Sequence, residues 1–148
     1  DAGIHLVVGP QLGAGPYWLD PDRLAQVVTN LVGNALRACQ PGGRVLVETI
    51  GQSDQVIVRV VDDGVGLHAE DLERIFERFY RVRHPHSASE GGTDNGSGIG
   101  LTISRRIVQA LGGTLTAASP GLGQGATFTV TLPAHTHDLV VPSAPARV

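Results

Sequence analysis

The sequence predicts a single α/β domain, and three observations lead to this expectation. The chain has 148 residues, which is the usual size of one domain and enough to bury a hydrophobic core. Segments with apolar residues at helical spacing alternate with short apolar runs typical of strands. Apolar residues make up 41% and aromatic residues only 4%, so the core must consist mainly of aliphatic side chains.

Short apolar runs predict the strands of this domain. Many of their residues are β-branched, and polar or glycine-rich turns separate them. Strands are expected at residues 4–8, 17–19, 44–50, 55–62, 114–119 and 126–132. The turns at 51–54 and 120–125 are short enough to join neighbouring strands, so they predict two hairpins.

Three segments predict helices. The first covers residues 21–40, with Asp20 as its cap and Pro21 at its first position. The second is expected over residues 70–75, with a continuation to about 79. The third follows a glycine-rich run and stops at Gly112. Its buried side is expected to consist of Leu101, Ser104, Ile107, Val108 and Leu111.

Charge and cysteine content exclude several classes of protein. All eleven basic residues are arginines, and without a lysine a P-loop is excluded. The net charge of −3 argues against a general nucleic-acid or anionic-membrane surface. Cys39 is the single cysteine, so no internal disulfide can form, and the sequence has no signal peptide or membrane-spanning run. We therefore expect a cytoplasmic domain, and the start at Asp1 suggests a piece of a longer protein.

The first predicted helix carries polar residues at helical spacing. The stripe consists of Arg23, Gln26, Asn30, Asn34 and Arg37. A solvated face is one interpretation. However, Asn is a poor helix former, and its amide oxygen is a good ligand for Mg²⁺. Asn34 with Arg37 one turn on would present an oxygen ligand beside a guanidinium group.

A second candidate site follows the strand at 55–62. Taken alone, Asp63 and Gly64 form a common hairpin signal. No alternating strand follows, however, and Gly66 comes two residues later. A carboxylate at a strand end beside two glycines can accept a hydrogen bond from an exocyclic amine while a flat base approaches the backbone. Asp62 is therefore a candidate for reading a nucleobase.

The third candidate site is the glycine-rich run before the last helix. Gly96, Gly98 and Gly100 follow a polar loop, whereas a dinucleotide-binding fold would place a hydrophobic strand there. The amides at 98–101 still predict an anion site, because a helix N-terminus has unpaired N–H groups and a favourable dipole. The preceding stretch, residues 82–95, has the length and composition of a binding loop.

Together these segments resemble the catalytic ATP-binding domain of bacterial two-component sensor histidine kinases. The resemblance covers Ile4 to Pro133 and rests on motifs in the expected order. They resemble the N box (20–38), the G1 box (62–66), the F box (75–81), the G2 box (96–103) and the closing glycine-rich hairpin (123–133).

The resemblance implies a Bergerat ATP-binding fold. This is an α/β (α+β) two-layer sandwich, with a mixed five-stranded sheet and about three helices on one face. The catalytic ATP-binding domain would cover residues 1–133, with an ATP lid at 82–96. Residues 134–148 are expected to form a disordered C-terminal tail.

The resemblance also implies roles for individual residues. Asn34 would ligate Mg²⁺, Asn30 would support it, and Arg37 stands where a phosphate-contacting Lys is common. Arg81 would lie near the γ-phosphate, and these four would be the catalytic residues. Nucleotide contacts are implied for Asn34, Arg37, Ala38, Asp62, Gly64, Gly66, Ile75, Tyr80, Arg81, Gly96, Ser97, Gly98, Ile99, Gly100, Leu101 and Thr127.

Three positions depart from the pattern of the family. Ala38 stands where a Tyr beside the adenine is common, Asp63 where Asn is common, and Ala126 where Thr is common. Ala38 weakens the expected base stacking. None of the three removes an expected metal or amine contact, so nucleotide binding is still expected.

The implied activity is transfer of the γ-phosphate of Mg·ATP to a histidine on a separate dimerisation and phosphoacceptor domain. None of this chain's histidines sits in the acidic, proline-followed setting of a phosphoacceptor; they are His5, His68, His84, His86, His135 and His137. A response regulator would be an indirect partner. The isolated domain is expected to be a monomer, and the full kinase a homodimer with a membrane anchor.

Three alternatives remain open. An ATP hydrolase of the gyrase, Hsp90 and MutL type shares the implied fold, but there a water-activating Glu occupies the position of Asn30. A serine kinase of the anti-sigma type would lack a separate phosphoacceptor domain. A nucleotide-sensing module without catalysis is the third alternative.

Overall fold

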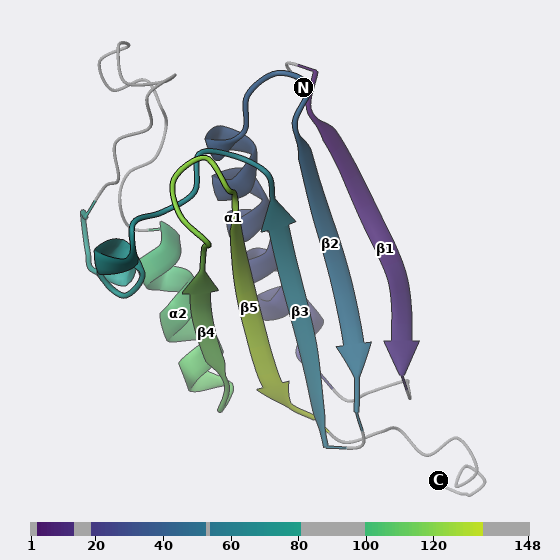
Figure 1. Ribbon diagram of the computed structural model, residues 1–148. Helices are drawn as coiled ribbons and strands as arrows, with labels where there is room; N and C mark the ends of the chain where they lie inside the picture. Colours follow the sequence, from purple (N-terminus) through teal and green to yellow (C-terminus); the bar gives the residue numbers. More distant parts are fainter. Residues whose placement is uncertain (1–2, 14–18, 53, 81–99, 135–148) are drawn as a thin grey trace, which may run out of the picture.

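The computed structural model describes residues 3–13, 19–52, 54–80 and 100–134 of the chain. Within these ranges it has one sheet with helices on one face (Figure 1). The strands are β1 (His5–Gly13), β2 (Arg44–Gly51), β3 (Gln55–Asp62), β4 (Thr114–Ala118) and β5 (Ala126–Pro133). The helices are α1 (Pro21–Ala38) and α2 (Gly100–Ala110), with 3-10 turns η1 (Ala69–Asp71) and η2 (Arg74–Phe76).

The sheet is mixed, with the strand order β1-β2-β3-β5-β4. β1 pairs with β2 in parallel, whereas β2 with β3, β3 with β5 and β4 with β5 are antiparallel. The two hairpins predicted from the sequence, β2 with β3 and β4 with β5, are therefore confirmed. The mixed five-stranded sheet of the predicted fold class is confirmed as well.

β1 is longer than the expected strand at 4–8, because it continues to Gly13. Its register with β2 shifts between Val8 and Gln11. Pro10 lies inside this shift, and a proline has no N–H to donate to a ladder, which is why prolines in strands occur at edges and bulges. The expected strand at 17–19 lies largely outside the described residues, and Leu19 is not in a strand.

α1 begins as the sequence predicts. The Asp20 carboxylate accepts a hydrogen bond from the backbone N–H of Arg23 at 3.3 Å, and Pro21 occupies the first turn, where its missing N–H costs nothing. The helix ends at Ala38, two residues before the predicted end, because Cys39 is already extended.

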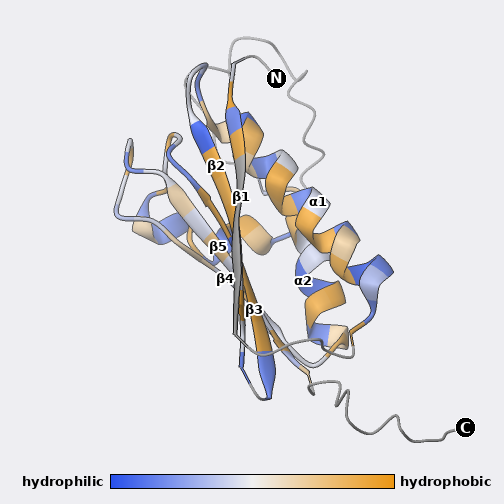
Figure 2. Cartoon of the chain, turned by 90° about the vertical axis from the view of Figure 1, so that its right-hand side faces the viewer, coloured by the Kyte–Doolittle hydropathy of each residue, from blue (hydrophilic) through white to orange (hydrophobic). Residues whose placement is uncertain are grey.

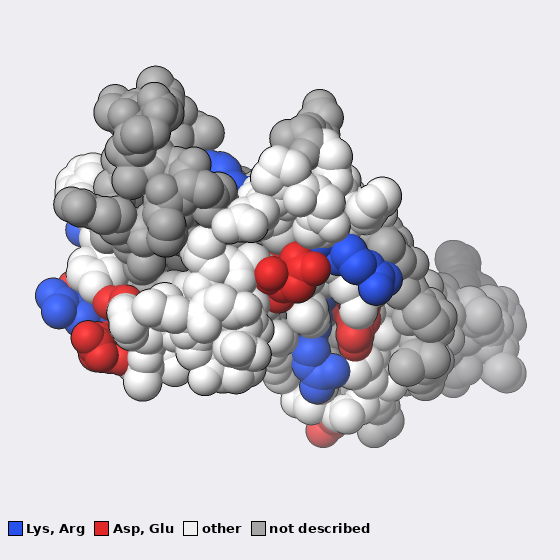
Figure 3. Space-filling view, turned by 45° about the horizontal axis from the view of Figure 1, so that its top comes forward, with Lys and Arg blue, Asp and Glu red and all other residues white. Residues whose placement is uncertain are grey.

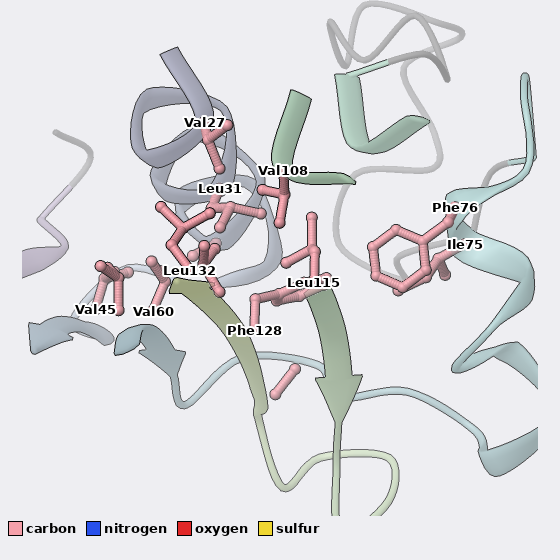
Figure 4. Packing of buried hydrophobic residues seen from close by; sticks show 14 of the residues in the cluster. Val27, Leu31, Val45, Val60, Ile75, Phe76, Val108, Leu115, Phe128 and Leu132 are labelled. Carbon is pink, nitrogen blue, oxygen red and sulfur yellow. The ribbon is translucent and has the colours of Figure 1, made fainter. Parts of the chain in front are cut away.

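Hydrophobic segments of the helices and the sheet face one another (orange in Figure 2), and their buried residues form one cluster. Val27 and Leu31 of α1 and Val108 of α2 point onto the sheet residues Leu115 and Leu132 (Figure 4). All five side chains are at most 1% exposed. Aliphatic residues dominate this layer, as the low aromatic content predicts.

The third helix is confirmed, with its predicted side turned to the core. Ser104 and Val108 of α2 are fully buried. Leu101, Ile107 and Leu111 are partly buried and pack against the same cluster. The chain then reverses at Gly112, whose φ of +86° is in the left-handed region that favours glycine.

The predicted helix at 70–79 is wrong. The segment forms the two separate 3-10 turns η1 and η2, and the chain becomes extended at Glu77. Tertiary contacts explain the break: the carbonyl of Phe76 accepts a hydrogen bond from the Thr102 hydroxyl at 2.8 Å, and the Phe76 ring packs edge-on against Phe128. These contacts with α2 and β5 replace the hydrogen bonds of a continuous helix.

The expected lid at 82–96 lies outside the described residues, as does the expected tail from 135 onward. Ala134, expected to begin the tail, is only 4% exposed, and its N–H donates to the carbonyl of Asp54 at 3.1 Å. Among the described residues, no helix has the length and apolar character needed to cross a membrane.

Leu31→Ala should lower the free energy of unfolding by about 3 kcal/mol, because it removes a fully buried side chain between α1 and the sheet. Leu122→Ala is the control, since Leu122 is 56% exposed, and it should change the free energy by less than about 0.5 kcal/mol. Equilibrium unfolding in denaturant measures both. Equal effects of the two substitutions would contradict the packing described here.

Candidate nucleotide site

The candidate site lies at one end of the sheet, where β3 ends. The segment after β3 passes between the end of α1 and the loop that joins β4 to β5. The N–H of Val65 donates to the carbonyl of Ala38 at 3.1 Å, and the carbonyl of Val65 accepts from Gly123 at 2.7 Å. The G1 segment (62–66) is therefore bound to elements on both of its sides.

Asp62 is the last residue of β3, and its side chain faces the helices because alternate β3 residues are buried. It is 5% exposed. Its Oδ1 accepts a hydrogen bond from the N–H of Gly64 at 2.8 Å. Its Oδ2 is buried and has no hydrogen-bond partner among the described residues. A buried acceptor in this state is costly, so it marks a place where a donor is expected to bind.

Burial raises the pKa of Asp62 from 3.8 to about 6, because the charged form loses its hydration. The backbone amides of Gly64 and Ala126 act in the opposite direction, Gly64 through the hydrogen bond to Oδ1. The neighbouring charge of Asp63 raises the pKa further. The carboxylate is therefore ionised at neutral pH, but at a cost to the folded state.

Gly64 and Gly66 are required by close backbone contacts. A Cβ on Gly64 would lie 2.3 Å from the carbonyl oxygen of Ala38, and one on Gly66 would lie 2.1 Å from the carbonyl oxygen of Gly121. The φ of Gly66 is +72°, which also favours glycine. The structure thus brings Ala38, Asp62, Gly64 and Gly66 together, as the sequence predicts.

Ser119 supports the site, although the sequence interpretation did not include it. Its hydroxyl oxygen accepts from the N–H of Leu67 at 3.0 Å and from the N–H of Gly121 at 3.1 Å, and the hydroxyl donates to the carbonyl of Gly125 at 2.7 Å. It therefore joins the G1 segment to the β4–β5 loop. No sequence signal identifies it, because these partners come together only in the fold.

A cleft of about 790 Å³ opens beside the G1 segment. It lies between the chain after α1, the G1 segment, η1 and the β4–β5 loop. Its lining residues are Gln40, Pro41, Gly42, Gly43, Asp63, Gly64, Val65, Gly66, His68, Asp71, Tyr80, Leu122 and Gly123. Gly64, Gly66 and Tyr80 of the predicted nucleotide contacts therefore share a cleft large enough for a small ligand.

Tyr80 is held at this cleft by its hydroxyl. The hydroxyl donates to Oδ1 of Asp71, a carboxylate that is only 8% exposed, and the Arg74 guanidinium lies 4.9 Å from the centre of the Tyr80 ring. The bond to Asp71 raises the pKa of the tyrosine. Ile75, another predicted contact, is 6% exposed and belongs to the core.

The polar stripe of α1 divides between two environments. The Asn30 amide donates to the hydroxyl of Ser104 on α2 at 3.0 Å, so Asn30 faces the other helix and not bulk solvent. Asn34 is half-buried one turn further on. Arg37 is exposed in the last turn, and its guanidinium lies 3.6 Å from the position of a Cβ on Gly33.

The remaining predicted contacts fall into three groups. Gly100 and Leu101 form the first turn of α2. Thr127 is not brought to the site: strand residues alternate between faces, and Ala126, paired with Asp62, takes the inward position in β5. Thr127 therefore lies on the face of the sheet away from the helices. Arg81, Gly96, Ser97, Gly98 and Ile99 lie outside the described residues.

On the face drawn in Figure 3, the described acidic and basic residues lie close to one another and form no basic patch. Opposite charges also pair on the sheet, where the charged atoms of Arg59 on β3 and Glu48 on β2 are 3.7 Å apart. This mixed distribution agrees with the net charge of −3.

Comparison with known families agrees with this arrangement. The model of histidine kinase-, DNA gyrase B-, and HSP90-like ATPases matches residues 19–136, and the chain belongs to this family. The chain is 47% identical to the sensor protein ChvG of Agrobacterium fabrum over 78% of its length, and 38% identical to the sensor histidine kinase WalK of Bacillus subtilis, also over 78%. It spans about a fifth of each relative, 20% and 18%.

Solved structures give the same result. The mycobacterial sensor histidine kinase MprB superposes with a TM-score of 0.73 at 26% identity, covering 92% of this chain and 85% of that chain. Full-length ShkA, solved in complex with AMPPNP, superposes with a TM-score of 0.75 at 29% identity, covering 92% of this chain and 27% of that chain. The resemblance to sensor histidine kinases is therefore confirmed.

The raised pKa of Asp62 predicts a pH-dependent stability. The folded state binds the Asp62 proton more tightly than the unfolded state. Protonation of Asp62 therefore stabilises the folded state fully below pH 3.8, and this stabilisation is lost as the pH rises to about 6. Asp62→Asn lacks this titration. Its free energy of unfolding relative to the wild type should therefore increase by about 2 kcal/mol between pH 4 and pH 7.

Denaturant unfolding at a series of pH values measures this difference. Asp54→Asn is the matched control, because Asp54 is exposed and lies just before the start of β3, at the opposite end of the strand from Asp62. The control should run parallel to the wild type. A constant difference between Asp62→Asn and the wild type would refute the assigned pKa.

Proposed function

We propose that this chain is the catalytic ATP-binding part of a two-component sensor histidine kinase. It binds Mg·ATP and transfers the γ-phosphate to a histidine on a separate dimerisation and phosphoacceptor domain. The observation that carries this proposal is the buried Oδ2 of Asp62, which lies beside the backbone of Gly64 and has no hydrogen-bond partner in the described part of the chain. Similarity to sensor kinases supports it.

Asp62 would read the adenine base. An ionised carboxylate can only accept hydrogen bonds, and adenine offers a donor, its exocyclic amine, where guanine has a carbonyl. The glycine backbone at 64 and 66 would let a flat ring approach closely. Ala38 and Ile75 would contribute apolar contacts, although Ala38 offers less surface than a tyrosine.

The polar stripe and the start of α2 would hold the metal and the phosphates. Mg²⁺ prefers oxygen ligands and is commonly held by few protein groups together with substrate phosphates. The half-buried amide of Asn34 fits this preference, and the described residues contain no group of three acidic, His or Cys side chains that could hold a metal alone. When bound, Mg²⁺ would neutralise phosphate charge.

The phosphates themselves would meet groups of opposite polarity. Arg37 would contribute a guanidinium at the end of α1, and the amides of Gly100 and Leu101 would face phosphate at the start of α2. Residues 96–99 and Arg81 would complete this set, with Arg81 near the γ-phosphate. The segment 82–96 would act as the lid.

The absence of a base at Asn30 favours transfer over hydrolysis. An amide cannot take a proton from water, and the Asn30 amide is already bound to Ser104. Positioning and charge neutralisation are sufficient for phosphoryl transfer when another domain supplies the nucleophile. A hydrolase, a serine kinase and a nucleotide sensor without catalysis are the alternatives that the experiments below distinguish.

The proposal extends to assembly and location. The partner would be the dimerisation domain of the same kinase, and a response regulator would receive the phosphoryl group afterwards. The isolated domain would be a monomer, and the full kinase a homodimer with this domain in the cytoplasm and an anchor in the membrane. The sensor proteins among its relatives support this arrangement.

The wild-type chain should bind ATP at least about tenfold more tightly than GTP, because the guanine carbonyl would face the Asp62 carboxylate and leave two acceptors opposed. Asp62→Asn should remove this preference, since its amide can also donate. Competition against a fluorescent ATP analogue measures the ratio. Asp63→Asn should keep the wild-type ratio, and equal binding of ATP and GTP by the wild type contradicts the role of Asp62.

The chain alone should neither label itself nor release phosphate quickly. It should phosphorylate a histidine only when the dimerisation domain of its kinase is added. Transfer of radiolabelled γ-phosphate, with and without that domain, and a parallel phosphate-release measurement test this expectation. Rapid turnover of ATP by the chain alone would favour a hydrolase, and stable labelling of Ser or Thr would favour a serine kinase.

A further inference from the structure

A fully buried hydroxyl lies between α1 and α2. Ser104 is 0% exposed, and together with Val108 it forms the buried side of α2. The side chain of Val108 points into the core (Figure 4). The neighbouring positions of this side are apolar, namely Leu101, Ile107 and Leu111. A hydroxyl at such a position is costly unless it has a hydrogen-bond partner. The buried hydroxyl of Ser104 therefore needs a hydrogen-bond partner.

The partner of Ser104 is Asn30 on α1. Nδ2 of Asn30 donates to Oγ of Ser104 at 3.0 Å, and 74 positions separate the two residues in the sequence. Asn30 is half-buried, and it lies one helical turn before Asn34 on the polar stripe. The bond therefore connects the inner side of α2 with the stripe that would hold the metal.

The bond fixes the orientation of the Asn30 amide. The torsion at the end of an Asn side chain has two broad preferences, which exchange the places of its oxygen and nitrogen. With Nδ2 held on Ser104, Oδ1 lies on the other side of the amide. Without Ser104, both orientations would be accessible. In the structure the hydroxyl of Ser104 accepts from Nδ2, which leaves Oδ1 on the side of the amide away from Ser104.

We propose that Ser104 is a positioning residue for Mg·ATP binding: it holds the Asn30 amide with its oxygen available to the hydrated metal ion. This inference rests on the proposed function, because it assumes that the stripe of α1 meets Mg·ATP. Ser104 touches neither nucleotide nor metal. It acts through Asn30 and affects the metal-dependent part of binding alone.

The test separates binding with and without Mg²⁺. Calorimetric titration of Ser104→Ala should show Mg·ATP affinity reduced about tenfold, which corresponds to the net free energy of one hydrogen bond. The affinity for ATP in EDTA should be unchanged. Val108→Ala is the matched control, because Val108 is also 0% exposed on the same side of α2 but has no polar group. It should leave the ratio of the two affinities at the wild-type value.

A double substitution tests whether Ser104 acts through Asn30. Asn30→Ala should weaken Mg·ATP binding, and adding Ser104→Ala to it should cause no further loss. Additive losses would overturn the proposal. So would an equal loss with and without Mg²⁺ in Ser104→Ala, no loss in either condition, or a matching effect of Val108→Ala.

Nuclear magnetic resonance of the ligand-free chain keeps the two proposals distinguishable. The Asn30 side-chain NH₂ protons should exchange slowly with water in the wild type and quickly in Ser104→Ala. Rapid exchange in a wild type that binds ATP would overturn the role of Ser104 and leave the proposed function standing. Failure of the wild type to bind ATP would overturn the proposed function, and the positioning role with it, even where exchange is slow.

Discussion

The structure of the candidate site depends on backbone packed directly against backbone around the G1 segment. The carbonyl of Gly64 accepts a hydrogen bond from the N–H of Gly125 at 3.1 Å. On the other side, the N–H of Val65 donates to the carbonyl of Ala38. No side chain fits into these contacts, as the 2.3 Å and 2.1 Å approaches at Gly64 and Gly66 show. Because this segment cannot shift without breaking hydrogen bonds on both sides, Asp62 is held at a fixed place at the end of β3.

Fixing Asp62 in this way has an energetic cost, which the aliphatic core must offset. Burial raises the pKa of Asp62 to about 6, so at neutral pH the folded state keeps a charged carboxylate with little hydration. Ser104 is a second polar group in a fully buried position, and it is satisfied by Asn30. Asp62 lies at the proposed nucleotide site, and Ser104 is buried between α1 and α2. The rest of the layer between helices and sheet consists mainly of Val, Leu, Ile, Phe and Ala.

Local patterns predicted most of the fold, and long-range contacts account for what they missed. The cap at Asp20, the two hairpins and the inner side of α2 follow from periodicity and turn residues, which act within a few positions. The predicted helix at 70–79 failed because Phe76 has its partners in α2 and β5, far away in the sequence. Thr127 lies on the opposite face of β5 from Ala126, because successive strand residues face opposite sides. The support from Ser119 and the bond from Asn30 to Ser104 join distant segments, so no local pattern could indicate them.

The strand order explains why the separate motifs meet at one end of the molecule. β2 is antiparallel to β3, so the start of β2 lies beside the end of β3. Because α1 leads directly into β2, α1 also ends there. β4 runs in the same direction as β3, since both are antiparallel to β5, and α2 precedes β4 by a tight turn at Gly112. α2 therefore starts at the end where β3 and β4 finish (Figure 1). Two different parts of the chain thus form the site. Asp62 at the end of β3 would read the base, and the start of α2 would face phosphate. The hydrogen bond between Asn30 and Ser104 joins α1, which carries the polar stripe, to α2, which would face phosphate. We therefore expect it to affect Mg·ATP binding and not metal-free ATP binding.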